Sequence, residues 1–264
     1  MTRAVGIDIG GTGIKAAVVN LETGELESER LKVPTPEGGD PAGIVDAVVG
    51  LVDEMDIADE PTIPVGVCFP AIILDGRTMS AANISQKWIG LEAEALFERR
   101  LGREIHFVND ADAAGFAEVR YGAAAGRAGL TIVTTLGTGI GSALIYNGVL
   151  IPNSELGHLE IDGADAEDRA ANSVREAEDL SWEEWAKRLQ RYYTHLELLF
   201  SPNLFIVGGG VSKSCEEFLP LLKLRTPIVP AALRNNAGIM GAAALAVREL
   251  QPFDTVAERP TQHK

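Results

Sequence analysis

The sequence has few cysteines, a deficit of positive charge and no long apolar run. Its 264 residues include two cysteines, Cys68 and Cys215, which are too few for a disulfide framework or a four-cysteine zinc site. Lysine and arginine total 23 against 38 acidic residues, and the net charge of −15 argues against a nucleic-acid-binding protein that relies on a broad basic surface. Neither a charged-then-apolar leader nor an apolar run of about 18 residues is present. We therefore expect a cytoplasmic protein that binds neither nucleic acid nor membrane.

Strand and helix patterns alternate along the chain, which indicates an α/β fold. Three strand patterns come first, in AVGIDIG, IKAAVVNL and LESERLKVPT, and Asp40-Pro41 then predicts the cap and first turn of a helix. A second series of strands begins at LTIVTTLGTGIGSALIYNG. Further along, Ser181 to Glu184 form a capping box, Ser212 is a candidate helix cap, and the alanine-rich segment 237–250 predicts a closely packed helix.

The glycine-rich stretch GIDIGGTGIK is a candidate phosphate-binding turn. A Walker loop needs Gly-Lys followed by a hydroxyl residue, but Ile14 precedes Lys15 and Ala16 follows it. A dinucleotide-binding turn leads into a helix, whereas AAVVNL predicts a second strand. The turn therefore joins two strands, and a simple hairpin that binds nothing remains the alternative to phosphate binding.

The letters GTGI occur twice, at 11–14 and at 137–140, each time between two apolar strands. The shared context favours an internal duplication and hence two similar lobes. We place these lobes at residues 1–110 and 111–264, with the helix 237–250 as a candidate to pack back on the first lobe. If the lobes face each other, both turns offer backbone N–H groups to phosphates across a cleft.

Five motifs in one order, DIGGTGIK, FVNDADAAGFAE, TLGTGIGSALI, ELGHLEI and IVGGGVS, resemble those of the ROK sugar kinases. The resemblance spans residues 4–247, and within the family the chain looks most like the polyphosphate glucokinases, including the polyphosphate/ATP glucomannokinases. It implies a duplicated α/β fold of the actin/hexokinase-like (ribonuclease H-like) type, with two lobes and an inter-lobe cleft. It also implies a homodimer.

The sequence departs from this family at one point. Many ROK proteins carry a CxCGxxGC zinc segment after their ExGH motif, but no cysteine lies between Cys68 and Cys215 here. The sequence therefore excludes a structural zinc of that kind, and His158 cannot be its ligand. We expect packing or hydrogen bonds to hold the loop from Asp162 to Ser173 instead.

Asp110 is the candidate general base. It follows the strand EIHFVN where the next helix begins, so the helix dipole favours its ionised form, which can accept the proton of a sugar hydroxyl. From the residues alone, the favoured interpretation is that Asp110 or Asp112 caps this helix. The resemblance matches Asn109-Asp110 to the Asn-Asp pair of the family and implies that Asp110 is catalytic.

The resemblance also implies a set of binding residues. Sugar contacts are implied for Asn109, Asp110, Glu155 and His158, and less directly for Asn83 and Glu167; for Asn83, Glu155 and His158 the alternative is an ordinary surface turn. Phosphate contacts are implied for Gly11, Thr12, Gly13, Lys15, Thr138 and Gly139, nucleotide contacts for Gly208, Gly209 and Gly210, and a water-mediated Mg²⁺ contact for Asp8. A tight strand-to-helix turn also explains the three glycines from 208 to 210.

A polyphosphate chain needs a positively charged track. The candidates are Lys15, Arg175, Lys213, Lys223, Arg225 and Arg234, each of which can equally be an ordinary solvated charge. We expect charge reversal at Lys213 or Arg225 to weaken polyphosphate binding more than ATP binding.

These observations predict a hexose kinase. It would use polyphosphate or ATP, with Mg²⁺, to phosphorylate the 6-hydroxyl of glucose and also that of mannose. One alternative is an ATP-only sugar kinase of the same fold. A sugar-sensing repressor is disfavoured because the glycine motif begins at Gly6 and leaves no room for an amino-terminal DNA-binding domain, and a chaperone or filament ATPase is disfavoured by the sugar motifs.

Overall fold

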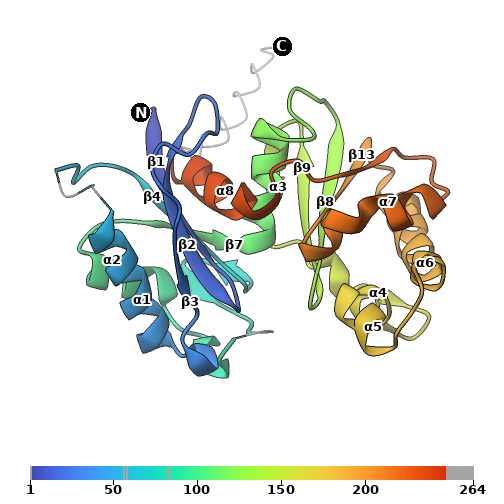
Figure 1. Cartoon of the computed structure of the whole chain (residues 1–264), viewed down its shortest axis with the longest axis horizontal. Helices are drawn as coiled ribbons and strands as arrows, with labels where there is room; N and C mark the ends of the chain where they lie inside the picture. Colours follow the sequence, from blue (N-terminus) through green and yellow to red (C-terminus); the bar gives the residue numbers. More distant parts are fainter. Residues whose placement is uncertain (1, 56, 58, 82–83, 248–264) are drawn as a thin grey trace, which may run out of the picture.

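Two mixed β-sheets lie on either side of a central pair of helices (Figure 1). The computed structural model describes residues 2–55, 57, 59–81 and 84–247. The first sheet has the order β3 (Leu31–Pro34), β2 (Gly13–Asn20), β1 (Arg3–Ile9), β4 (Val65–Phe69) and β7 (His106–Asn109). The second has the order β10 (Val149–Ile151), β9 (Ile140–Tyr146), β8 (Leu130–Leu136), β13 (Leu204–Gly208) and β14 (Ile228–Pro230).

The second sheet repeats the first strand by strand. β1 and β2 pair antiparallel, as do β8 and β9, and each pair is extended by a further antiparallel strand, β3 or β10. On the other side β4 and β7 add in parallel to β1, as β13 and β14 add to β8. The two GTGI turns join the equivalent pairs β1–β2 and β8–β9, so the duplication expected from the sequence is confirmed.

Outer helices cover one face of each sheet. The first sheet packs against α1 (Pro41–Glu54) and α2 (Ala93–Leu101), and the second against α6 (Trp182–Phe200) and α7 (Cys215–Phe218). The strand period explains this layering, because Val5, Ile7 and Ile9 share the core with α1 while the residues between them face the centre of the molecule. Asp40 caps α1 and the capping box at Ser181 opens α6, as predicted.

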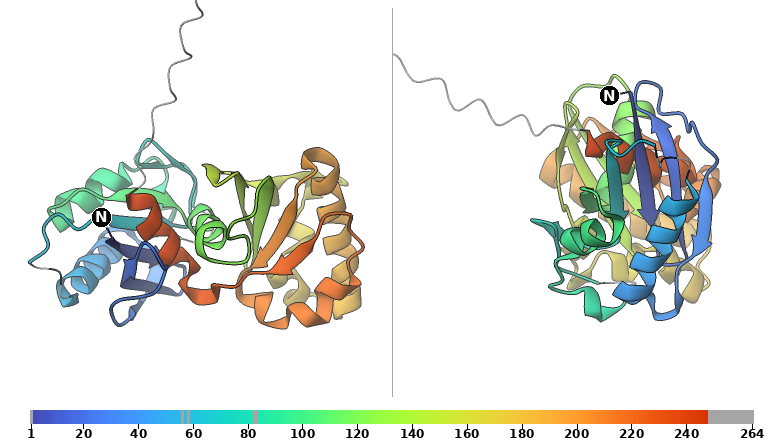
Figure 2. Two further views of the ribbon diagram at one scale, coloured as in Figure 1. Left: turned by 90° about the horizontal axis from the view of Figure 1, so that it is seen from above. Right: turned by 90° about the vertical axis from the view of Figure 1, so that its left-hand side faces the viewer.

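Each of the two central helices follows a strand of one sheet and packs on the other sheet. α3 (Asp110–Tyr121) follows β7 of the first sheet but packs on β8 and β9 of the second, whereas α8 (Ala237–Ala246) follows β14 but packs on β1 and β4 of the first (Figures 1 and 2). The contacts are very close. A Cβ on Gly6 would lie 1.9 Å from the carbonyl oxygen of Ile239, and one on Gly241 would lie 1.8 Å from that of Ala113. Small residues therefore let α8 contact both its sheet and α3.

Shorter elements complete the chain and correct two predictions. They are the hairpin of β5 (Ile73–Leu74) and β6 (Arg77–Thr78), the pair β11 (Glu160–Ile161) and β12 (Ala164–Asp165), and the helices α4 (Glu167–Ala170) and α5 (Asn172–Ala177). Ser212 does not cap a helix, because it lies inside a 3-10 helix over Gly210–Ser214 that runs directly into α7. The third predicted strand is shorter than expected, since the backbone pairs in a ladder only from Leu31.

The last predicted helix, 237–250, is α8, and residues 248–250 lie outside the described part of the chain. Its close packing against the first sheet agrees with its alanine-rich sequence. The division into lobes at residues 1–110 and 111–264 stays a prediction. Within the described ranges, no helix is long and apolar enough to cross a membrane.

Candidate active site

The carboxyl ends of strands from both sheets meet at a cavity of about 250 Å³. Its lining includes Asp8 from β1, Asp110 directly after β7, Thr135 from β8 and Gly208 from the end of β13. In open α/β sheets, ligands bind outside the carboxyl ends of the strands, where the connecting loops leave a crevice. This cavity is therefore the candidate active site.

Asp8 and Lys15 form an ion pair on the wall of the cavity. They are partners across the β1–β2 ladder, with 2.8 Å between Lys15 Nζ and Asp8 Oδ2. The first turn of α8 lies against this pair, since a Cβ on Gly238 would lie 2.9 Å from Asp8 Cγ. The site thus holds a partly exposed carboxylate, able to bind a hydrated cation, beside an ammonium group that can contact a phosphate oxygen.

Asp110 is the first residue of α3 and its side chain is half-buried. Its Oδ1 accepts the N–H of Ala111 at 2.8 Å. Burial, reinforced by the charge of Asp8, raises the pKa of Asp110 to about 6, so burial outweighs the helix dipole that the sequence led us to emphasise. At pH 7 the carboxylate is still mostly ionised, with a pKa close enough to neutrality for a general base.

Asn109, the residue before α3, is the cap of this helix. Its Oδ1 accepts the N–H of Asp112 at 3.0 Å and its Nδ2 donates to the carbonyl oxygen of Ala71 at 3.0 Å. The interpretation that Asp110 or Asp112 caps α3 is therefore wrong. An asparagine with extended backbone geometry at the end of β7 satisfies the free N–H groups of the helix.

The wall opposite Asp8 carries glycines and cations. Gly208 to Gly210, Lys213 and Arg234 line it. Gly209 has a φ of 83°, and a Cβ there would lie 2.3 Å from the carbonyl oxygen of Leu136, so a tight turn explains this glycine independently of any ligand.

Glu118 is a structurally important residue that the sequence analysis missed. It is buried on α3, lines the cavity, and accepts the N–H groups of Ala232 and Leu233 at 3.1 and 2.7 Å. It thereby anchors the loop that carries Arg234. The signal was a glutamate on a helix face that is otherwise small and apolar, FVNDADAAGFAE, because a buried carboxylate needs partners.

Glu155, His158 and Glu167 lie outside the lining of this cavity and form a neighbouring cluster. Glu155 is close enough to Asp110 for its charge to raise the pKa of Asp110 further. His158 Nδ1 lies 2.9 Å from Asp165 Oδ2 and 3.8 Å from Glu167 Oε1, and the hydrogen bond with Asp165 raises the pKa of His158. Burial raises the pKa of Glu155, an effect that His158 partly offsets. The structure thus brings Asp110, Glu155, His158 and Glu167 together, whereas Asn83 lies outside the described residues.

The glycine turns lie beside the cavity lining rather than within it. Gly11, Thr12 and Thr138 are exposed, and the lining of the cavity includes none of Gly11, Thr12, Gly13, Thr138 and Gly139. The second turn is tied to the cluster of Glu155, His158 and Glu167, because Glu167 Oε2 accepts the N–H of Ile140 at 2.9 Å. The phosphate contacts of these residues stay predictions.

The six candidate cations of the polyphosphate track separate into two groups. Lys15, Lys213 and Arg234 line the cavity. Arg175, Lys223 and Arg225 do not: Arg175 lies over the ring of Trp182 at 4.2 Å, Lys223 lines a depression beside α6, and Arg225 donates to Ser201 Oγ. These three residues therefore lie outside the lining of this cavity, and their contact with polyphosphate stays a prediction.

Comparison with known proteins assigns the family. The model of the ROK family matches residues 4–171, which is more than half of the chain. The chain belongs to the ROK family. A relative from Mycobacterium tuberculosis, polyphosphate glucokinase, is 45% identical over 245 residues, which cover 92% of this chain and 91% of that protein.

Solved ROK structures share the fold. The inorganic polyphosphate/ATP-glucomannokinase of Arthrobacter sp. strain KM is 54% identical, with a TM-score of 0.87 over 93% of this chain and 98% of that chain. A ROK family glucokinase from Streptomyces griseus, solved with glucose and AMPPNP, is 27% identical, with a TM-score of 0.76 over 92% of this chain and 98% of that chain. The expected two-lobe, actin/hexokinase-like α/β fold is confirmed.

In this ROK protein, hydrogen bonds hold the loop from Asp162 to Ser173. Arg191 on α6 binds both carboxylate oxygens of Asp162, at 3.0 and 2.8 Å, and Trp185 Nε1 donates to the carbonyl oxygen of Ala170 at 3.0 Å. At the far end of the loop, Ser173 N–H donates to the carbonyl oxygen of Gly137 at 3.0 Å. The expectation that hydrogen bonds hold residues 162–173 is confirmed.

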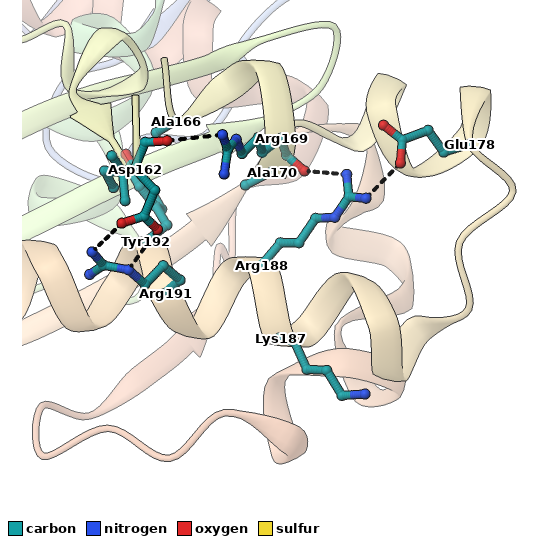
Figure 3. Close-up of a pocket in the computed structure, with 10 residues that line it drawn as sticks. Asp162, Ala166, Arg169, Ala170, Glu178, Lys187, Arg188, Arg191 and Tyr192 are labelled. Carbon is teal, nitrogen blue, oxygen red and sulfur yellow. Dashed lines mark hydrogen bonds and ion pairs between the residues drawn. The ribbon is translucent and has the colours of Figure 1, made fainter. Parts of the chain in front are cut away.

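A larger cavity of about 490 Å³ lies between α4 and α6 (Figure 3). Although arginines line it, Arg188 is paired with Glu178 at 2.6 Å and Arg191 with Asp162. The acidic partners offset much of the positive charge, and the lining shares no residue with the cavity at Asp110. The smaller cavity at Asp110 therefore remains the candidate active site.

Proposed function

We propose that this protein transfers a terminal phosphoryl group from inorganic polyphosphate or ATP to the 6-hydroxyl of glucose, with mannose as a second acceptor. The observation that carries the proposal is the half-buried carboxylate of Asp110, with the Asp8–Lys15 pair on one side and Glu155 on the other. Similarity to a polyphosphate glucokinase and to a polyphosphate/ATP-glucomannokinase over more than nine-tenths of the chain supports both the acceptors and the donors.

In the proposed reaction, Asp110 accepts the proton of the 6-hydroxyl while that oxygen attacks the terminal phosphorus. The new O–P bond forms as the bond from this phosphorus to its bridging oxygen breaks, which leaves ADP or a polyphosphate shorter by one unit. Lys15, Lys213 and Arg234 stabilise the charge on the phosphate oxygens. Asn109, Glu155, His158 and Glu167 hold the sugar hydroxyls, and Gly208 to Gly210 lie next to the adenosine of ATP.

The oxygen ligands available at this site suit a Mg²⁺ ion that binds together with polyphosphate or ATP. Mg²⁺ keeps several waters and binds through one or two carboxylates together with phosphate oxygens. Asp8 presents such a carboxylate on the cavity wall, while in the described part of the chain no three His, Cys, Asp or Glu side chains are grouped to hold a metal by themselves. Asp8 would hold the hydrated ion, which when bound neutralises charge on the donor phosphates.

The proposal is tested by measuring glucose 6-phosphate formation with polyphosphate and with ATP, each with and without Mg²⁺. We expect product with both donors, and product from mannose measured as mannose 6-phosphate. Product with ATP alone would overturn the polyphosphate part and favour an ATP-only kinase. Absence of product from either sugar with either donor would overturn the hexose kinase itself.

Lys213→Glu is expected to raise the KM for polyphosphate roughly tenfold and the KM for ATP less. The reason is that a polyphosphate chain carries more negative charge than ATP near Lys213, which lines the cavity. Lys187→Glu is the matched control, since Lys187 on α6 lines the cavity between α4 and α6 and not this one. Steady-state kinetics with both donors provides the measurement. Equal increases for the two donors, or an equal effect of Lys187→Glu, would contradict the role of Lys213.

We also propose that the protein acts as a homodimer in the cytoplasm. The thiols of Cys68 and Cys215 are buried and unpaired, which suits a reducing compartment. Leu198 and Leu199 on α6 are 76% and 53% exposed, and neighbouring exposed leucines are typical of a protein interface. Light scattering that gives the mass of a single chain would contradict the dimer.

A further inference from the structure

A closed ring of hydrogen bonds joins the start of α3 to both halves of the molecule. Asn109 Oδ1 accepts the N–H of Asp112 at 3.0 Å, and Asn109 Nδ2 donates to the carbonyl oxygen of Ala71 at 3.0 Å. Two residues on, the backbone of Ile73 bonds to the side chain of Asn153, N–H to Oδ1 and carbonyl oxygen to Nδ2, both at 2.8 Å. Asn153 N–H donates to Asp112 Oδ2 at 2.7 Å and closes the ring.

The ring is assembled from buried and partly buried groups in a specific geometry. Asn109 and Asp112 are 7% and 1% exposed. Asn153 has a φ of 57°, the left-handed conformation that asparagine tolerates better than most residues. In this conformation its side-chain amide makes two hydrogen bonds with the backbone of Ile73, as a neighbouring strand residue would. Water cannot easily replace such bonds at buried positions, so losing one leaves a polar group unsatisfied.

The ring adjoins residues that are proposed to bind the hexose. Asn109 precedes Asp110, and Asn153 precedes Glu155 by two residues. Ala71 and Ile73 follow β4 of the first sheet, whereas Asn153 follows β10 of the second. Each sheet therefore contributes one segment to the ring, and α3 contributes the third.

We propose that Asn153 and Asp112 are positioning residues for the hexose, which fix Asn109-Asp110 and Glu155 relative to each other across the two sheets. This inference rests on the proposed glucose phosphorylation. Neither residue needs to touch the substrate. The ring fixes the distance between the base, Asp110, and the carboxylate of Glu155. Loss of the ring therefore lets glucose bind in a wider range of positions relative to Asp110.

The test is steady-state kinetics of Asn153→Gly, which keeps the left-handed backbone and removes both bonds to Ile73. We expect the KM for glucose to rise about tenfold and the KM for the phosphate donor to change less than about twofold, since two hydrogen bonds are lost on the sugar side only. Asn147→Gly is the matched control. Asn147 is also left-handed, with φ 50°, and its side chain accepts one hydrogen bond from Gly129 N–H at the exposed β9–β10 turn. The control is expected to leave both KM values unchanged.

A second variant keeps the test decisive if Asn153→Gly folds poorly. Asn153→Asp preserves the acceptor for Ile73 N–H but replaces the donor with a negatively charged oxygen that faces the Ile73 carbonyl oxygen, and we expect a rise of at least about threefold in the KM for glucose. Combining Asn153→Gly with Asp112→Ala is expected to raise that KM no further than the larger single effect, because both changes open the same ring. Independent, multiplying effects would overturn the inference.

The outcomes also separate this inference from the proposed function. If the wild-type protein forms no hexose phosphate, the proposed function fails and the ring has no hexose to position. If the wild type is active but a folded Asn153→Gly variant has an unchanged KM for glucose, or equal increases for glucose and donor, the positioning role is wrong and the ring serves stability alone. Thermal unfolding of each variant confirms that the kinetics are those of folded protein.

Discussion

Asp110→Asn is expected to lower kcat for glucose phosphorylation by about a thousandfold, because general base catalysis typically contributes 10²–10⁴-fold and asparagine cannot accept the proton. The substitution preserves the size of the side chain and its hydrogen bond from Ala111 N–H. Glucose binding is therefore expected to remain measurable by calorimetry. The measurement is kcat with saturating polyphosphate or ATP.

The matched control is Asp53→Asn on the exposed side of α1, which is expected to leave kcat unchanged. A near-normal kcat in Asp110→Asn would contradict the assignment of the base. So would a complete loss of glucose binding, since the effect would then lie in the binding site as a whole rather than in proton transfer.

The pH dependence follows from the raised pKa of Asp110. Since the base must be ionised, wild-type kcat/KM is expected to increase about tenfold per pH unit below pH 6 and to level off above it. The folded pKa lies above the ordinary value of 3.8, so stability present at low pH is lost as the pH rises through about 6. Asp110→Asn is then expected to raise the Tm more at pH 8 than at pH 5. An equal gain at both pH values would point to a cause other than ionisation.

Gly241→Val is expected to destabilise the protein by about 3 kcal/mol or more, or to prevent folding, because a side chain here forces α8 away from α3. The added Cβ would lie 1.8 Å from the carbonyl oxygen of Ala113, a backbone atom that cannot move aside without shifting a helix. Chemical unfolding measures the change in the free energy of unfolding, and expression in soluble form gives a first indication.

The matched control for this substitution is Gly50→Ala. Gly50 also lies within a helix, α1, but nothing lies within 4 Å of a Cβ built there. Because alanine is the better helix former, this change is expected to stabilise the protein by about 0.5–1 kcal/mol. A Gly241→Val protein as stable as the wild type would show that α8 and α3 are not in the close contact described.

Local patterns predicted much of the fold. Alternating apolar residues gave the strands, and the caps at Asp40 and Ser181 were correct because the side chain and the N–H groups that it binds are within three residues of each other. Local patterns were insufficient where contacts with residues distant in the chain determine the local structure. Ser212 has the composition of a cap, but the chain after β13 tightens into a 3-10 helix and uses no side-chain cap.

The residues of the candidate site also divide into those that the sequence predicted and those that it did not. The repeated turn is visible in the sequence itself, whereas Asp8, Lys15 and Asp110 were identified through the resemblance to the ROK motifs, since the residues alone favoured a capping role for Asp110 or Asp112. The sequence could not show that Arg225 lies away from the cavity lining, since the direction of a long surface side chain depends on packing that no short motif encodes. Asn153 was missed altogether, because its partners Ile73 and Asp112 are distant in the chain and become neighbours only in the folded protein.

Because α8 packs on the first sheet, one face of that sheet stays uncovered until late in biosynthesis. The inner face of the amino-terminal sheet, with Gly6 and Gly66, is covered by residues near 239 and 242, which are synthesised well over a hundred residues after this sheet. At about 5–20 residues per second, that apolar face stays open for many seconds of translation. The nascent chain is therefore exposed to chaperones and to aggregation until α8 emerges, and ribosome-bound chains that end before residue 237 should be far more sensitive to protease than the finished protein.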